Sequence, residues 1–148
     1  MHSKILVATD GSELATQAVK TGVQLASELK ASLTIVSVTE PLPPIDAAAQ
    51  AEIGVKDPFA KYEQVVERGA LQSLAVAQQL ATEAGVDCET IHVKDSYPAI
   101  GIVQTAETCS ADLIVMASHG RRGLTKLLLG SVTNEVLVKS KVPVLVCR

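Results

Sequence analysis

The chain has 148 residues, of which 47% are hydrophobic and 20% are charged, proportions that are ordinary for one globular domain. Its formal net charge of -3 argues against the basic face of a duplex-binding protein and against a polybasic membrane anchor. With two Tyr, one Phe and no Trp, the core must be built from Val, Leu, Ile and Ala, which favour strands and helices.

The first third of the chain predicts a strand, a helix and a second strand. Residues 4–9 form an unbroken apolar run, KILVAT, closed by the turn sequence of residues 10–12, which is typical of a strand buried on both faces. Ser12 is a favourable helix N-cap, and apolar residues then recur at helical spacing up to Leu29. Residues 32–39, SLTIVSVT, complete a right-handed βαβ unit with parallel strands.

Residues 40–57 interrupt this order. The segment carries three prolines near its start and no clean period, so it predicts a long loop with at most a short helix over 47–51. From residue 58 to about residue 84 an apolar stripe, which includes Tyr62, Val66 and Ala70, predicts one long helix, which Gly85 ends.

The last part of the chain repeats the strand–helix alternation. Three further strands are predicted over 88–94, 112–117 and 142–147. Pro98 opens a helix at a position that suits proline, and Ser131 is predicted to cap a last helix that runs to about Lys139.

Five strands alternating with four helices predict an α/β fold, an open five-stranded parallel sheet with helices on both faces. No linker or repeat divides the chain, so residues 1–148 are expected to form a single domain. Open sheets of this kind bind ligands outside the carboxyl ends of their strands, where the strand order reverses. The residues that follow the first, second and fourth strands are therefore the functional candidates.

Two of these places are rich in polar and small residues. The first is the segment 9–12, and the second runs from Ala117 to Ser131 with glycines at 120, 123 and 130. Helix N-termini present free N–H groups and a partial positive charge, and glycine lets the main chain approach phosphate oxygens closely. The spacing matches neither G-x-x-x-x-G-K-[ST] nor G-x-G-x-x-G. The residues alone therefore predict an anion site.

The two segments also carry a family resemblance over nearly the whole length. The opening KILVATDGSELATQAV and the closing SHGRRGLTKLLLGSVTNEVLVKSKVPVLV resemble the universal stress protein family. The ATP-binding members of that family share a pattern of Gly, two residues, Gly, nine residues, Gly, and then Ser or Thr. The last three of these positions match Gly120, Gly130 and Ser131, and Ala117 stands at the first glycine position. The resemblance implies a Rossmann-like, adenine nucleotide alpha hydrolase-like fold and a bound ATP or AMP. It also implies a homodimer formed through the last strand.

The resemblance further implies which residues meet the nucleotide. The set is drawn from the strand ends and the two loops: Ala8, Thr9, Asp10, Val38, Met116, Ala117, Gly120, Gly130, Ser131 and Val132. Val38 would lie against the adenine and Asp10 near the adenosine, whereas Gly120 and the last three members would contact the phosphates. Arg121 and Arg122 are possible phosphate contacts, equally well explained as a solvated loop face.

Several of these residues have simpler explanations. Asp10 also suits a plain turn, and Gly130-Ser131 also suits a plain helix start. His119 is better explained as an exposed loop histidine than as a general base. The sequence predicts no catalytic residue and no metal held by the protein, although Mg²⁺ can accompany ATP because phosphate oxygens are hard ligands. The alternatives to a nucleotide-binding stress or signalling protein are a slow ATP hydrolase and a homodimer that binds no nucleotide.

The sequence also predicts where the protein resides. No apolar stretch approaches the roughly 20 residues that span a bilayer. Cys88, Cys109 and Cys147 are far apart, odd in number and without a CxxC pair, which fits a reducing compartment. We therefore expect a cytoplasmic protein with no membrane and no nucleic-acid partner.

Overall fold

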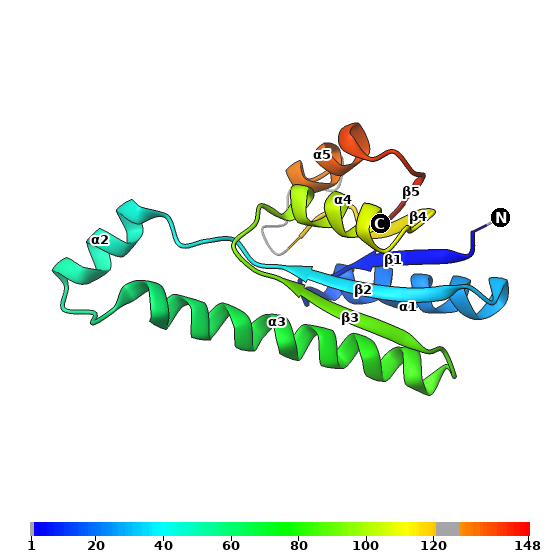
Figure 1. Ribbon diagram of the computed structural model, residues 1–148, viewed down its shortest axis with the longest axis horizontal. Helices are drawn as coiled ribbons and strands as arrows, with labels where there is room; N and C mark the ends of the chain where they lie inside the picture. Colours follow the sequence, from blue (N-terminus) through cyan, green and yellow to red (C-terminus); the bar gives the residue numbers. More distant parts are fainter. Residues whose placement is uncertain (1, 121–127) are drawn as a thin grey trace.

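A computed structural model of the chain describes residues 2–120 and 128–148. Strands and helices alternate along most of the chain (Figure 1). The strands are β1 (Lys4–Ala8), β2 (Ser32–Val38), β3 (Cys88–Val93), β4 (Leu113–Ala117) and β5 (Val144–Cys147). The helices are α1 (Glu13–Leu29), α2 (Pro44–Glu52), α3 (Pro58–Glu83), α4 (Pro98–Thr108) and α5 (Ser131–Lys139).

The five strands form one parallel sheet in the order β3-β2-β1-β4-β5. The predicted fold class is thus confirmed, and each predicted strand is present with bounds that differ by at most two residues. The chain runs outwards from the central β1 to β3 and then returns to the other side of β1 with β4. The strand order therefore reverses between β1 and β4, whose carboxyl ends mark the topological switch point.

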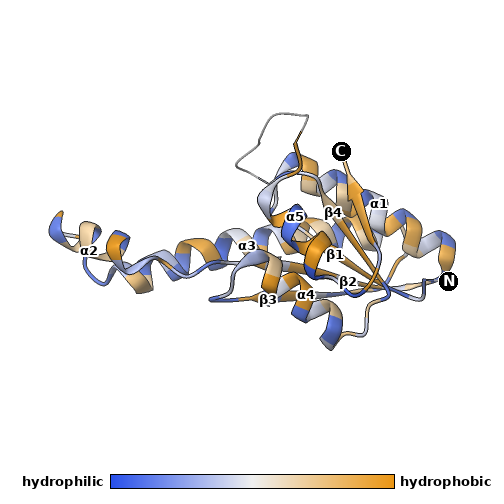
Figure 2. Ribbon diagram, turned by 90° about the horizontal axis from the view of Figure 1, so that it is seen from above, coloured by the Kyte–Doolittle hydropathy of each residue, from blue (hydrophilic) through white to orange (hydrophobic). Residues whose placement is uncertain are grey.

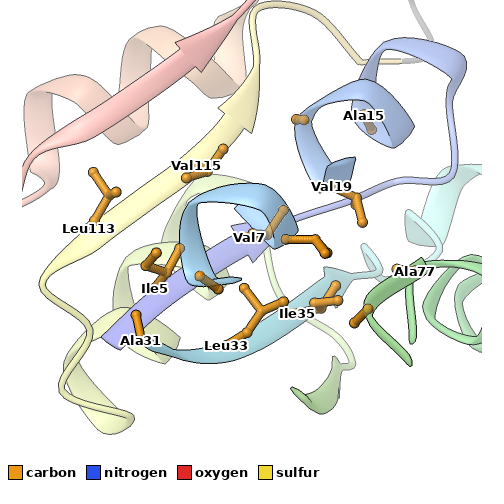
Figure 3. Close-up of a cluster of buried hydrophobic side chains, with 14 of the residues drawn as sticks. Ile5, Val7, Ala15, Val19, Ala31, Leu33, Ile35, Ala77, Leu113 and Val115 are labelled. Carbon is orange, nitrogen blue, oxygen red and sulfur yellow. The ribbon is translucent and has the colours of Figure 1, made fainter. Parts of the chain in front are cut away.

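Two apolar layers pack on opposite faces of the sheet. Alternation along β1 sends Ile5 and Val7 to the face covered by α1 and α3, where they join a cluster that also contains Val19 and Ile35 (Figure 3). Leu6 and its neighbours pack on the other face against α4 and α5. Because both faces are covered, the central strands β1 and β4 are apolar along nearly their whole length.

The segment 40–57 is more ordered than predicted. It contains the helix α2, which extends beyond the residues 47–51 expected from the sequence and brings the helices to five among the described residues. Pro44 occupies the first turn, where its missing N–H leaves no intrahelical bond unmade, and the alanine-rich run that follows favours a helix. Figures 1 and 2 show α2 and the adjoining half of α3 extending away from the sheet.

The beginnings of two helices test the predicted caps. The Ser12 side chain accepts a hydrogen bond of 3.2 Å from the Ala15 N–H, as predicted for an N-cap. The prediction for Ser131 is wrong by one residue, because Gly130 is the N-cap and Ser131 is the first residue of α5. Gly130 has no side chain with which to cap the first N–H groups, which leaves them for other acceptors. In the described part of the chain, no helix is long and apolar enough to cross a membrane.

Candidate functional site

A cavity of about 600 Å³ lies at the carboxyl ends of β1, β2 and β4. It is lined by all ten residues predicted from the two loops and the strand ends: Ala8, Thr9, Asp10, Val38, Met116, Ala117, Gly120, Gly130, Ser131 and Val132. Arg121 and Arg122, the two possible phosphate contacts, lie outside the described residues. The structure thus brings together segments that are more than a hundred residues apart in the chain.

The turn after β1 holds the Asp10 carboxylate in one orientation. The Thr9 N–H donates to the Val36 carbonyl at 2.9 Å, which ties the turn to β2. The Ser12 N–H donates to Asp10 Oδ1 at 2.9 Å, and the positive φ of 80° at Gly11 allows the chain to turn between them. Asp10 therefore presents a fixed acceptor at the cavity, of the kind that binds a ribose hydroxyl.

The loop after β4 packs directly on that carboxylate. A Cβ added at Gly120 would lie 2.8 Å from Asp10 Oδ2, closer than side chains approach one another. A larger residue at position 120 would therefore displace the Asp10 carboxylate or the main chain after β4, which gives glycine a packing reason besides the phosphate contacts that the resemblance implies. The turn after β1 and the loop after β4 form one continuous surface.

The amino end of α5 supplies main-chain donors beside this surface. The first intrahelical bond runs from the Asn134 N–H to the Gly130 carbonyl at 3.0 Å, so the N–H groups of Ser131, Val132 and Thr133 precede the helical ladder. The Thr133 hydroxyl donates to the Ala117 carbonyl at 2.9 Å, which fixes the helix end against β4. Free N–H groups and the positive end of the helix dipole together attract an anion.

Apolar side chains form the part of the cavity away from the loops. Ala8 and Val38 end β1 and β2, Met116 is the next-to-last residue of β4, and all three lie on the sheet face covered by α4. Met116 and Ala117 are 5% and 7% exposed, so both are core residues that reach the cavity with only part of their surface. These side chains give the cavity an apolar part beside its polar loops.

Several lining residues were not predicted. They are contributed by α3, α4, the end of β2 and the first turns of α1 and α5, and they are Ala15, Val36, Ser37, Thr39, Glu40, Tyr62, Val65, Val66, Gly69, Ala70, Pro98, Ile102, His119 and Thr133. Sequence periodicity identified Tyr62, Val66 and Ala70 as one stripe of α3 but gave no indication that the stripe faces the ligand cavity. The Tyr62 hydroxyl donates to the Glu40 carbonyl at 3.0 Å and so fixes α3 against the end of β2.

His92 of β3 contacts Thr39, a residue that lines the cavity just after β2. His92 Nε2 is 2.9 Å from the Thr39 hydroxyl, and burial followed by the nearby Lys94 ammonium lowers the pKa of His92. Lys94 in turn pairs with Glu67 of α3 at 2.7 Å. These contacts hold β3 and α3 together beside the cavity. Within the described ranges, no three His, Cys, Asp or Glu residues are grouped to bind a metal ion.

The sheet order and the position of the cavity define a doubly wound α/β protein with a candidate ligand site at its topological switch point. The model of the universal stress protein family matches residues 1–148, and the chain belongs to that family. The resemblance inferred from the opening and closing segments is thereby confirmed.

Individual relatives agree with this assignment. The chain is 34% identical to the universal stress protein YxiE of Bacillus subtilis, and the alignment covers 100% of both chains. Its fold is similar to the solved structure of protein MJ0577, with a TM-score of 0.75, 28% identity and coverage of 99% and 96% of the two chains. It is also similar to a universal stress protein solved in complex with cAMP, with a TM-score of 0.68, 27% identity and coverage of 98% and 95%.

Proposed function

We propose that the protein binds an adenine mononucleotide, ATP or AMP, and acts in stress response or signalling through binding. The observation that carries this proposal is the convergence of the fixed Asp10 carboxylate and the open amino end of α5 on one cavity. An apolar wall, a carboxylate that can accept from a hydroxyl, and a helix amino end that attracts anions all line this cavity, which supports a ligand with a base, a ribose and phosphates. The similar protein in complex with cAMP supports the same ligand class.

The proposal assigns each part of the ligand to described residues. Val38 and Met116 would contact the adenine, Asp10 the ribose, and the main-chain N–H groups of Ser131 and Val132 the phosphates. With ATP, Mg²⁺ would be held mainly by phosphate oxygens, which are hard ligands that suit this ion.

Titration calorimetry on the purified protein tests the proposal directly. We expect AMP and ATP to bind, and adenosine to bind at least about tenfold more weakly because it forgoes the charge-assisted contacts at α5. GTP serves as the control for the base. Mass spectrometry of the untreated preparation should identify an adenine nucleotide carried through purification. Absence of heat with all of these ligands at millimolar concentration would overturn the proposal in favour of a homodimer without nucleotide, and steady phosphate release would favour a slow hydrolase.

We also propose a homodimer formed through β5, in the cytoplasm. β5 lies at the edge of the sheet, where Pro143 and Cys147 direct their carbonyls to β4 through bonds of 3.0 and 2.7 Å. Because successive residues alternate, Val144 and Val146 direct their main-chain groups to the open edge. Such an edge favours pairing with another strand, and Leu145 of β5 is 38% exposed. All three cysteines are free, which supports a reducing compartment.

Sedimentation equilibrium tests the proposed dimer. The wild-type protein should have about twice the 15.5 kDa mass of one chain. Replacing Val146 by proline removes an N–H from the open edge and should yield a folded monomer, whereas Val146→Thr keeps both the N–H and the branched side chain and should leave the dimer intact. A wild-type protein that sediments as one chain, or a dimer that survives Val146→Pro, would contradict the proposed interface.

A further inference from the structure

Two short segments are described between β4 and α5: Ser118–Gly120 follows β4, and Leu128–Gly130 precedes α5. We call them the first and the second stem. The His119 imidazole connects them. Its Nε2 contacts the Leu128 carbonyl on the second stem, and its Nδ1 lies 2.9 Å from the Ser118 hydroxyl on the first. We call these two contacts the His119 bridge.

The two partners of the bridge indicate which nitrogen of the His119 ring carries the hydrogen. A carbonyl oxygen only accepts hydrogen bonds, so Nε2 carries the hydrogen and donates it to Leu128. In the neutral imidazole, Nδ1 is then the acceptor for the hydroxyl of Ser118, a buried residue. Both nitrogens are occupied within the protein, an arrangement that suits a structural connection better than a general base.

The bridge adds a side-chain contact to one main-chain bond between the stems. The Gly130 N–H donates to the Ser118 carbonyl at 2.8 Å, whereas the Asn134 side-chain amide donates to the Leu129 carbonyl at 3.2 Å and ties the second stem to α5. Among the contacts of the described residues, the His119 bridge is the one in which a side chain of the first stem reaches the second. His119 also lines the cavity, as do Gly120 and Gly130.

We infer that His119 is a positioning residue that holds the two stems together and so preorganises the phosphate end of the site. This inference rests on the proposed nucleotide function for its purpose but not for its geometry. Groups that are fixed before binding lose less freedom when the ligand arrives, which raises affinity without any new contact. Loss of the bridge should therefore weaken ligands that carry phosphate and spare adenosine.

Limited proteolysis of the nucleotide-free protein tests the bridge alone. The segment between the stems contains Arg121, Arg122 and Lys126, which trypsin recognises by sequence. We expect His119→Ala to be cut there about five- to tenfold faster than wild type, because one lost hydrogen bond raises the open population by about that factor. His119→Gln retains an amide donor and should fall between the two. His2→Ala is the control, since His2 contacts the Asp112 carbonyl at the opposite end of the sheet.

Calorimetry on the same variants tests the consequence for binding. AMP affinity should fall about tenfold in His119→Ala and less in His119→Gln, while adenosine affinity stays at the wild-type value. Equal cleavage rates in wild type, His119→Ala and His119→Gln would overturn the inference whatever the nucleotide result. A wild-type protein that binds no nucleotide would end the proposed function but leave the proteolysis result valid. A parallel loss of adenosine affinity would show that His119 contacts the nucleoside instead.

Discussion

Replacing Gly120 by alanine should lower the affinity for adenine nucleotide by about ten- to a hundredfold. The new Cβ would stand 2.8 Å from Asp10 Oδ2, so either the carboxylate or the loop must move. Asp10 Oδ1 already accepts a hydrogen bond of 2.9 Å from the Ser12 N–H, which resists movement of the carboxylate. The two surfaces that we propose to hold ribose and phosphates would thus be displaced from each other by a single methyl group.

A double-mutant cycle measured by calorimetry checks this cause. If displacement of the carboxylate is responsible, Gly120→Ala should have little further effect in an Asp10→Ala background, since the clash is then gone. The melting temperature of Gly120→Ala should stay close to that of the wild type, because Gly120 is exposed and outside the apolar core. Full additivity of the two substitutions, or an unchanged affinity in Gly120→Ala, would contradict the packing argument.

Gly130 shows that a glycine expected at the phosphates can also be favoured by close packing within the protein. The sequence places it at the phosphates, but a Cβ there would lie 3.2 Å from the Ser118 carbonyl and 3.4 Å from the His119 Cα. Its φ of -62° is open to any residue, so conformational freedom is not what selects glycine. Close packing of the two stems is therefore a second reason for glycine, and a sequence pattern cannot separate that reason from ligand contact.

The strands and most helices were predictable because each is specified locally. Buried parallel strands such as β4 are unbroken apolar runs, and the turns that end them contain glycine or a capping residue. The helix α2 was expected at most over 47–51 because Pro43 and Pro44 suggested a loop, although Pro44 opens the helix. Proline disfavours helix interiors and favours helix starts, and composition alone does not say which applies.

The candidate site likewise contains residues that the sequence could identify and residues that it could not. Asp10 and Gly120 were identifiable because the carboxyl ends of neighbouring parallel strands must meet at one edge of the sheet. The α3 wall, with Tyr62 and Gly69, was not identifiable, because its place beside β2 depends on how a 26-residue helix packs over the sheet. Local patterns identify the buried stripe of a helix but not the element that it contacts.

Gly22 provides the second large expected effect, this time on the free energy of unfolding. Gly22 lies within α1, where alanine would ordinarily stabilise the helix by about 1 kcal/mol. We nevertheless expect Gly22→Ala to destabilise the protein by about 2 kcal/mol, because its Cβ would overlap the Cγ2 methyl of Val7. Val7 is 0% exposed and branched at Cβ, so it has neither space nor a free rotamer into which to move.

Gly69 is the matched control for this argument. It too lies inside a helix, α3, but a Cβ added there meets nothing within 4 Å. Gly69→Ala should therefore stabilise the protein by about 0.5–1 kcal/mol, the opposite sign to Gly22→Ala. Denaturant unfolding measures both, and a Val7→Ala substitution should remove most of the penalty at Gly22 in a double-mutant cycle. If Gly22→Ala were as stabilising as Gly69→Ala, α1 could not lie as close to β1 as the structure places it. The packing of α1, which follows the turn at Asp10, against the sheet would then be wrong.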